Sequence, residues 1–386
     1  RGGAGQQGRS VSWLPFYHDM GLVGFVLGPV TSQTSVDYLN PSEFVMRPQL
    51  WLSLLSRNRA TISFAPPFGY ELCTKRLKRQ NNLDYQLENW KIAGVGADMI
   101  QAPALLEFAD LLQPCGFSRD AFLACYGLAE ASLAVSFSQK GQGLKVENCK
   151  KKLLSESGVA LPAENDSAEE TVQFVKCGKL LAGLEVQVCD ESGQKLDKRR
   201  CGTLYVKGSC IMQGYVDQPG ETKNALSDQG WLDTGDLAYI SEDEEIVIVG
   251  RNKDMLLING KNIWPQDLES IAIRNSEVNT ADALAFSLQD TNGRDTAVVL
   301  LQTKEKEQTN SEEIVRQIKS DVYSQLGINC YVELVPLHTL PRTSSGKPSR
   351  SKAKKQFLQN MNFADPESVH TSNFNWEEKA AYNQLN

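Results

Sequence analysis

Near the carboxyl end of the chain, a lysine follows a run of small residues that could support chemistry. Lys347 ends the run TSSGK at residues 343–347, and Pro348 comes next. A phosphate-binding P-loop needs a glycine five residues before the Gly-Lys pair and a serine or threonine after the lysine, and this run has neither. A lysine on such a loop can still offer a point charge to a developing phosphoryl or carboxylate oxygen. The alternative is a solvated lysine on a surface loop.

A second set of charged residues lies in the segment Trp231–Glu269. This segment places Asp236 ahead of Arg251 and Lys253, with glycines between short β-like runs. No other stretch of the sequence combines an acid, two bases and turn-forming glycines in such a tight order. These residues are therefore the main candidates for a binding site.

Length and composition limit what kind of protein can position these residues. The 386 residues are 41% hydrophobic and 23% charged, which predicts a globular protein of two or three structural units. The net charge of −7 argues against a nucleic-acid partner, which usually requires a basic surface. No apolar run reaches the roughly 18 residues that a membrane-spanning helix needs, so we expect no transmembrane segment.

The cysteines and the first residues bear on location and on completeness. The 9 cysteines include no C-x-x-C pair and the chain has only 3 histidines, so we expect no structural zinc site. Free thiols are typical of a reducing compartment, and we expect a cytoplasmic protein. The chain begins Arg-Gly-Gly-Ala, without an initiator Met or a signal peptide, and we therefore interpret it as a fragment.

Short apolar strands alternate with helices between Thr61 and Tyr126. This order predicts a parallel sheet, in which ligands bind beyond the carboxyl ends of the strands. Two such ends are followed by Gly96-Ala97 and by Tyr126-Gly127. An accessible glycine backbone and an aromatic ring on one rim would suit a flat adenine. Ordinary turn chemistry is the alternative.

The polarity and the spacing of apolar residues change several times along the rest of the chain. The predicted fold class is α/β. We expect a large domain with an α/β part, a polar loop or insertion and a β-rich subdomain, then a small mobile α+β domain and a tail or linker. Their predicted ranges are 1–139, 140–171, 172–250, 251–358 and 359–386. The small domain should contain a helix from Pro265 and a longer helix over 311–326 with one apolar face.

Four motifs in this order resemble the adenylate-forming superfamily of acyl-CoA ligases, luciferases and nonribosomal adenylation domains. YGLAE at Tyr126–Glu130 resembles the adenine and magnesium motif, and TGD at Thr234–Asp236 resembles a ribose-binding element. GRNKD at Gly250–Asp254, followed by Gly260, is similar to the hinge region. PRTSSGK resembles the loop of the catalytic lysine. The resemblance extends to about Leu358.

Further runs resemble the fatty acyl-AMP ligase branch of that superfamily. They are WLPFYHDMGLVG at Trp13–Gly24, APPFGYELC at Ala65–Cys73, PCGF at Pro114–Phe117 and NIWPQDLE at Asn262–Glu269. The resemblance implies activation of a fatty acid with ATP and Mg²⁺, then transfer to the phosphopantetheine arm of an acyl carrier protein. The polar stretch 140–171 lies near the position of an insertion that is typical of this branch.

The resemblance also implies roles for residues around the nucleotide. Asp236 would accept both ribose hydroxyls, with Arg251 beside it unless Arg251 is a surface cation. Tyr126 would stack on adenine, and Glu130 would hold Mg²⁺ unless it is only a helix-face glutamate. The full predicted nucleotide-binding set is Gly96, Ala97, Asp98, Tyr126, Gly127, Asp236 and Arg251.

Three further residues are assigned in the same way. His18 would line the acyl pocket, with a core-packed histidine as the alternative. Lys253 would be the hinge about which the small domain rotates between chemical steps. Lys347 would stabilise charge as the fatty carboxylate attacks the α-phosphate and pyrophosphate leaves.

The sequence departs from the superfamily at its beginning. The loop that holds the ATP phosphates should precede Trp13, and no such segment stands there. We therefore expect these residues to be the carboxyl-terminal portion of a ligase and to be inactive alone. The rival hypotheses are a fatty acyl-CoA ligase and a non-catalytic module that binds an adenylate or a lipid. The presence of Glu130, Asp236 and Lys347 counts against the non-catalytic module.

Overall fold

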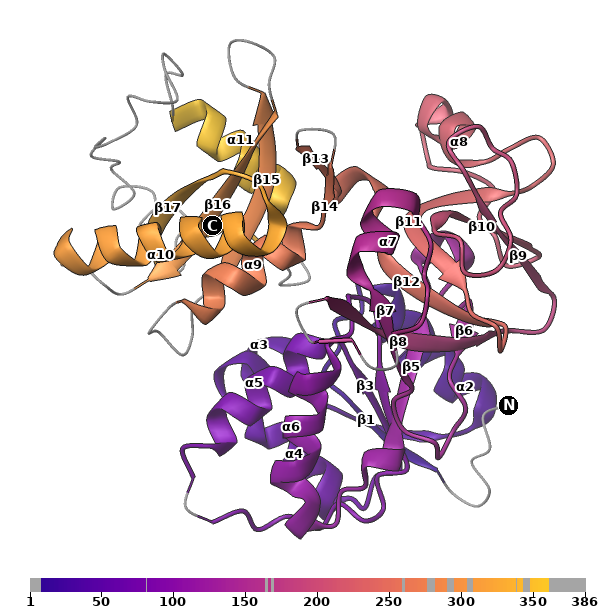
Figure 1. Ribbon diagram of the computed structural model, residues 1–386. Coiled ribbons are helices and arrows are strands. Elements are labelled where there is room, and N and C mark those ends of the chain that lie inside the picture. Colours follow the sequence, from indigo (N-terminus) through magenta and orange to yellow (C-terminus); the bar gives the residue numbers. More distant parts are fainter. Residues whose placement is uncertain are drawn as a thin grey trace. The chain divides into compact units, whose positions relative to one another are not determined.

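The strands and helices predicted between residues 61 and 126 are present in the computed structural model (Figure 1). The structure describes residues 8–80, 82–163, 166–167, 170–258, 261–275, 282–289, 295–303, 308–337, 339–342 and 348–360. The chain divides into a large unit, Arg1–Asn252, and a small unit, Lys253–Asn386. Each unit combines helices with a sheet, so the predicted α/β class is confirmed.

One part of the large unit's sheet is parallel, in the order β2-β1-β3-β4-β5. Helices α4, α5 and α6 lie along one face of these strands, and α2 lies on the other side (Figure 1). The strands are β1 (Arg9–Ser12), β2 (Ser35–Tyr38), β3 (Ile62–Ala65), β4 (Ile92–Val95) and β5 (Phe122–Tyr126). The helices are α1 (Asp19–Leu22), α2 (Gly28–Ser32), α3 (Pro41–Met46), α4 (Gln49–Arg57), α5 (Pro67–Leu77) and α6 (Ala102–Leu112).

An aromatic core fixes the parallel strands against the helices. Tyr70 on α5 is fully buried, contacts Trp90 and Phe108, and donates from its hydroxyl to the carbonyl of Gly94 on β4 at 2.8 Å. A side chain at Gly94 would lie 2.0 Å from the ring of Phe64, so only glycine lets the two strands pack here. The core therefore fixes the position of the carboxyl end of β4 relative to α5 and β3.

The same sheet continues beyond β5 as an antiparallel part, in the order β6-β8-β12-β11-β10-β9, with β7 paired to β8. The strands are β6 (Ser136–Phe137), β7 (Val146–Lys150), β8 (Thr171–Leu180), β9 (Leu184–Cys189), β10 (Gly202–Gly208), β11 (Leu232–Ile240) and β12 (Glu245–Arg251). Helices α7 (Lys151–Ser157) and α8 (Pro219–Ala225) belong to this part. The β-rich texture predicted for this region is present.

The polar stretch 140–171, for which a loop or insertion is predicted, contains regular structure in its described residues. Strand β7 pairs with β8 along its whole length, and helix α7 follows at once. The stretch therefore joins the sheet of the large unit. Its polarity is misleading because the charged side chains on β7 have ionic partners inside the unit.

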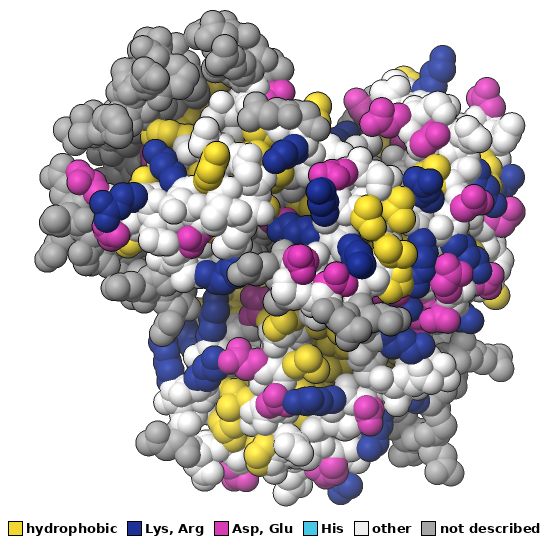
Figure 2. Space-filling model, viewed as in Figure 1, with side chains coloured by type: hydrophobic (Ala, Val, Ile, Leu, Met, Phe, Trp, Pro, Cys, Tyr) yellow, Lys and Arg dark blue, Asp and Glu magenta, His cyan; other side chains and the backbone are white. Residues whose placement is uncertain are grey.

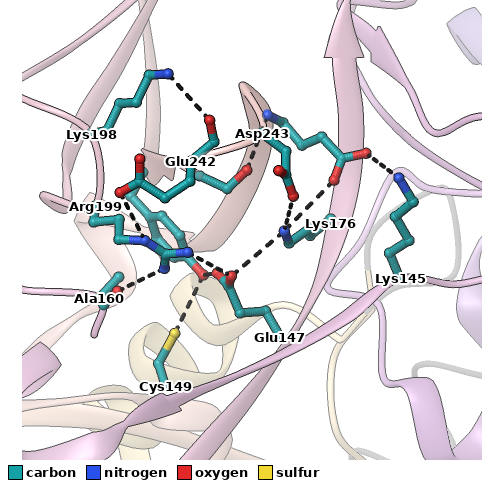
Figure 3. Close-up of polar contacts among 12 residues, drawn as sticks. Lys145, Glu147, Cys149, Ala160, Lys176, Lys198, Arg199, Glu242 and Asp243 are labelled. Carbon is teal, nitrogen blue, oxygen red and sulfur yellow. Dashed lines mark hydrogen bonds and ion pairs between the residues drawn. The ribbon is translucent and has the colours of Figure 1, made fainter. Parts of the chain in front are cut away.

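Those partners form a network of charges beneath β7 (Figure 3). Glu147 accepts a hydrogen bond from Arg199 at 3.1 Å and from the hydroxyl of Tyr239 at 2.5 Å. Lys176 on β8 lies 3.6 Å from Glu147 and 3.7 Å from Glu245, whose side chain is 3% exposed. Buried charges persist only when they are paired in this way, so the network ties β7, β8, β11 and β12 together.

The small unit surrounds a three-stranded sheet of order β15-β16-β17, with a separate hairpin of β13 and β14. Leu326, Val322 and Ile318 line the buried face of its long helix, as the sequence predicts, and Gly327 follows in the left-handed region at φ 66°. The elements are β13 (Leu256–Ile258), β14 (Lys261–Ile263), α9 (Pro265–Arg274), β15 (Ala283–Gln289), β16 (Asp295–Thr303), α10 (Gln308–Leu326), β17 (Cys330–Pro336) and α11 (Arg350–Asn360).

A partly buried arginine connects three elements of the small unit. Arg350, at the start of α11, donates two hydrogen bonds to Glu269 on α9, at 2.8 and 2.7 Å, and a third to Asp254 at 2.8 Å. Glu269 also accepts the backbone N–H of Ala285 on β15 at 2.9 Å. Just before this helix, Pro348 forms an isolated bridge with Arg342, so the two ends of the 343–347 segment lie side by side.

Two surface properties bear on partners. No helix among the residues that the structure describes is long and apolar enough to cross a membrane. Cationic and anionic side chains are interspersed over the described part of the face shown in Figure 2.

We predict that Glu147 makes the stability of the large unit depend on pH. Burial raises the pKa of Glu147, but hydrogen bonds from Tyr239 and Arg199 and the charges of Arg199 and Lys176 outweigh it and leave the pKa below 4.5. Its stabilisation is therefore present above the unfolded pKa and lost as pH falls through the folded pKa. Glu147→Gln should lower the free energy of unfolding near neutral pH by about 1.5–3 kcal/mol.

Urea unfolding, followed by tryptophan fluorescence from neutral to acidic pH, measures both effects. Glu185→Gln is the matched control because Glu185 is exposed on β9 of the same sheet. The assignment is wrong if Glu147→Gln loses stability on acidification as steeply as the parent chain.

We predict that Arg350→Met destabilises the small unit by roughly 3 kcal/mol, because it leaves the mostly buried carboxylate of Glu269 without its cation. Differential scanning calorimetry of the full chain measures the loss. Arg316→Met is the control, since its pair with Glu313 on α10 is exposed and should contribute little. Equal effects of the two substitutions would contradict the prediction.

Candidate active site

The candidate site begins where β4 and β5 end. These strands are parallel and in register through Val95 and Ala124, so the residues that follow them share one edge of the sheet. A Cβ atom at Gly96 would lie 2.6 Å from the sulfur of Cys125 and 2.7 Å from its carbonyl oxygen. Glycine is therefore required at position 96 for the two strand ends to approach each other.

The residues after Gly96 turn the chain sharply. Ala97 lies in the left-handed region at φ 65°, which costs an alanine roughly 1 kcal/mol. Asp98 accepts the N–H of Met99 on its own carboxylate at 2.9 Å. Three residues of the predicted nucleotide-binding set thus form a tight turn whose backbone stands at the edge of the sheet.

The central feature of the site is the carboxylate of Asp236. It is 7% exposed, and its Oδ2 accepts a hydrogen bond from the hydroxyl of Tyr126 at 2.7 Å. Its Oδ1 accepts from Nε of Arg251 at 3.1 Å. Tyr126 ends β5, whereas Asp236 and Arg251 are directly opposite each other on β11 and β12. The structure therefore brings together three predicted residues from distant parts of the sequence.

Burial and the hydrogen-bond partners of Asp236 shift its pKa in opposite directions. Burial raises the pKa of Asp236, while Tyr126 and Arg251 lower it, and the net pKa is above its ordinary 3.8. Burial and the neighbouring carboxylate of Asp236 hold the pKa of Tyr126 well above that of a free phenol. Tyr126 therefore remains protonated near neutral pH and donates its hydroxyl to Asp236.

The segment before Asp236 is shaped by its own hydrogen bonds. Thr234 donates from its hydroxyl to the carbonyl of Leu204 at 2.7 Å and accepts the N–H of Asp236 at 3.1 Å. Gly235 has φ 68°, and its N–H bonds to the carboxylate of Asp233 at 2.8 Å. The three residues of TGD thus have separate roles. Thr234 hydrogen-bonds the backbone through its hydroxyl, Gly235 adopts the left-handed conformation, and Asp236 supplies the carboxylate.

Glu130 lies in a short 3-10 turn just after β5. Gly127 precedes it, and a Cβ there would meet the carbonyl oxygen of Leu133 at 1.8 Å, so the chain can fold back only with glycine at 127. The hydroxyl of Tyr215 donates to Oε1 of Glu130 at 2.8 Å. Glu130 is half-buried in a turn, so it is not a residue on the face of a regular helix.

His18 stands at the carboxyl side of β1, another parallel strand. It caps the amino end of α1, where its Nδ1 accepts the N–H of Met20 at 3.2 Å. Its side chain is 30% exposed, which rules out the alternative of a core-packed histidine. Its role in an acyl pocket stays a prediction.

Two predicted residues belong to the small unit. Lys253 is the first residue of that unit and lies in a 3-10 turn, and its role as a hinge stays a prediction. Lys347 and Gly260 lie outside the described residues. Among the residues that are described, no cluster of three or more His, Cys, Asp or Glu side chains could enclose a metal ion.

The sequence did not reveal Tyr215. It is 85 positions from Glu130, and no local spacing connects the two. The supporting roles of Thr234 and Cys125 were also missed, because they depend on contacts between strands.

The comparisons with known proteins agree with this geometry. The family described as AMP-binding enzyme matches residues 1–216, and the AMP-binding enzyme C-terminal domain matches residues 260–355. A putative acyl-CoA synthetase of Caulobacter vibrioides is 42% identical over 351 residues, which cover 91% of this chain and 61% of the relative. A medium-chain-fatty-acid–[acyl-carrier-protein] ligase of Moorena producens is 30% identical over 365 residues, with 91% and 61% covered.

Solved structures with a similar fold include ligases that form acyl-adenylates. One from a study of fatty acyl-adenylate ligases of E. coli and L. pneumophila superposes with a TM-score of 0.83 at 39% identity, covering 93% of this chain and 63% of the other. The fatty acid AMP ligase of Legionella pneumophila gives a TM-score of 0.62 at 29% identity, with 91% and 62% covered. The chain spans about three-fifths of the length of the curated relatives that it matches. With its family match over residues 1–216 and this fold, the chain belongs to the family of AMP-binding enzymes.

Proposed function

We propose that the protein activates a fatty acid with ATP to form acyl-AMP and pyrophosphate. The observation that carries the proposal is the buried carboxylate of Asp236, held by Tyr126 and Arg251 where the parallel and antiparallel parts of the sheet meet. A fixed carboxylate that contacts the last residue of a parallel strand is suited to accept the two ribose hydroxyls of a nucleotide, because ligands bind beyond the carboxyl ends of such strands. Membership of the AMP-binding enzymes supports the same ligand.

The neighbouring turns would complete the nucleotide site. The backbone at Gly96, Ala97 and Asp98 and the aromatic ring of Tyr126 would receive the adenine, with Gly127 allowing close approach. These groups come from the ends of adjacent parallel strands, which is where ligands bind in such sheets. The proposed nucleotide site therefore lies entirely in the large unit.

Glu130 has the chemistry to hold Mg²⁺. Its carboxylate is half-buried, one oxygen is fixed by Tyr215, and oxygen ligands are those that Mg²⁺ prefers. The ion, when bound, would neutralise charge on the triphosphate. We propose no further metal ligand from this chain.

In the proposed reaction a carboxylate oxygen of the fatty acid forms a bond to the α-phosphorus. The bond from that phosphorus to the bridging oxygen breaks, and pyrophosphate leaves. Lys347 would stabilise the charge that develops, and Lys253 would act as the hinge of the small unit. His18 would contact the acyl chain.

We further propose transfer of the acyl group to the phosphopantetheine thiol of an acyl carrier protein. Two relatives, from Moorena producens and Teredinibacter turnerae, are named as medium-chain-fatty-acid ligases of an acyl carrier protein, which supports this acceptor. Transfer to CoA is the competing proposal, because the Caulobacter relative is named as a putative acyl-CoA synthetase. All 9 cysteines are unpaired, which supports a reducing compartment such as the cytoplasm.

We predict that the full-length natural protein, given ATP, Mg²⁺, a medium-chain fatty acid and excess CoA, accumulates acyl-AMP and leaves the CoA unused. Mass spectrometry identifies the product, and pyrophosphate release measures the rate. Lys347→Ala should abolish most of the release. Acyl-CoA as the product would establish the competing acceptor, and no pyrophosphate release in any condition would overturn the proposed function.

We predict that Asp236→Asn raises the KM for ATP about 10- to 100-fold, since a hydrogen bond to a charged acceptor contributes about 1.5–3 kcal/mol. The parent's ATP affinity should also weaken as pH falls through the raised pKa of Asp236, above 3.8. Asp190→Asn is the control, because Asp190 only closes an exposed turn. A KM unaffected by Asp236→Asn would exclude Asp236 from the nucleotide site.

A further inference from the structure

Glu130 is held by a segment far from it in sequence. The segment between β10 and α8 supplies the hydroxyl of Tyr215, which donates to Oε1 of Glu130 at 2.8 Å. The same segment supplies the N–H of Met212, which donates to the carbonyl of Glu130 at 2.8 Å. The carbonyl of Cys210 accepts the hydroxyl of Ser132 at 2.9 Å. The turn that carries Glu130 is therefore fixed on both its side chain and its backbone.

Tyr215 is itself fixed at its own backbone. Its N–H donates to the hydroxyl of Thr222 on α8 at 2.8 Å, and that hydroxyl donates to the carbonyl of Gln218 at 3.0 Å. Gly214, which precedes Tyr215, has φ 153°. A Cβ atom at this position would lie 2.7 Å from the side chain of Thr222, so there is no room for a larger residue. The phenol thus reaches Glu130 from a rigid support.

The hydrogen bond leaves half of the carboxylate open. Among the described residues Oε2 of Glu130 accepts no hydrogen bond, whereas Oε1 is occupied by Tyr215. A free glutamate loses side-chain conformational entropy when a ligand fixes it. A carboxylate that is already fixed avoids that loss.

We propose that Tyr215 is a positioning residue that orients Glu130 so that its open oxygen can bind the divalent cation of ATP. This inference rests on the proposed function, because Glu130 is a metal ligand only in that proposal. Residues that hold a metal ligand from behind typically change metal affinity about 10- to 100-fold when they are removed. The alternative is that the contact only holds two loops together.

The test is Tyr215→Phe in the full-length natural protein, with Mn²⁺ as the probe and an α,β-methylene analogue of ATP that is not cleaved. Electron paramagnetic resonance of free Mn²⁺ gives the affinity for the ternary complex without turnover. We expect the Kd for Mn²⁺ to rise about 10-fold, and the adenylation rate to recover at saturating Mg²⁺. A structural role alone would lower the rate at every metal concentration.

Two further variants make the result specific. In a Glu130→Gln background, Tyr215→Phe should have no additional effect on Mn²⁺ affinity, because the two residues act as one unit. Tyr331→Phe is the matched control: it removes a hydrogen bond between a tyrosine and Glu333 in the small unit and should leave Mn²⁺ affinity unchanged.

The outcomes separate this inference from the proposed function. An unchanged Kd for Mn²⁺ in Tyr215→Phe, or an additive effect with Glu130→Gln, overturns the positioning role while leaving adenylation intact. A parent protein that releases no pyrophosphate overturns the proposed function, and the Mn²⁺ titration still reports whether Tyr215 orients Glu130. Thermal melting of Tyr215→Phe checks that the loss of this one hydroxyl leaves the fold in place.

Discussion

The site depends on two hydrogen bonds to the carboxylate of Asp236, because these bonds connect the parallel part of the large sheet with its antiparallel part. Tyr126 ends the last parallel strand, and Arg251 ends an antiparallel strand of the same sheet. A buried carboxylate needs such partners to remain charged, and no neighbour of Asp236 along the chain supplies them. The carboxylate of Asp236 and the ends of β5 and β12 therefore hold one another in position.

Steric constraints at the same edge complement these hydrogen bonds. Gly96 and Gly127 follow adjacent parallel strands, and at each position a Cβ would overlap a carbonyl oxygen of a neighbouring segment. The close approach brings backbone to the rim, where a ligand can reach it. The hydrogen-bonded carboxylate of Asp236 and the closely packed glycines therefore lie in the same region of the large unit.

The periodicity of apolar residues predicted most of the α/β fold, because each strand or helix of the core carries its own local pattern. It failed where tertiary contacts decide. The polar stretch 140–171 predicts a loop or an insertion, yet it contains β7, whose Glu147 is paired with Lys176 on the neighbouring strand β8. The motifs pointed to Tyr126, Asp236 and Glu130 individually. The contact between Tyr126 and Asp236, and the contact between Tyr215 and Glu130, required the fold.

The continuity of the large sheet has a mechanical consequence. Strands β5 and β6 join the parallel and antiparallel parts through one ladder, with β8 next to β6. A strain at either part is passed through shared backbone hydrogen bonds, with no flexible linker to absorb it. The large unit should consequently melt in a single cooperative step, and the charge network under β7 and the nucleotide edge would lose their order together.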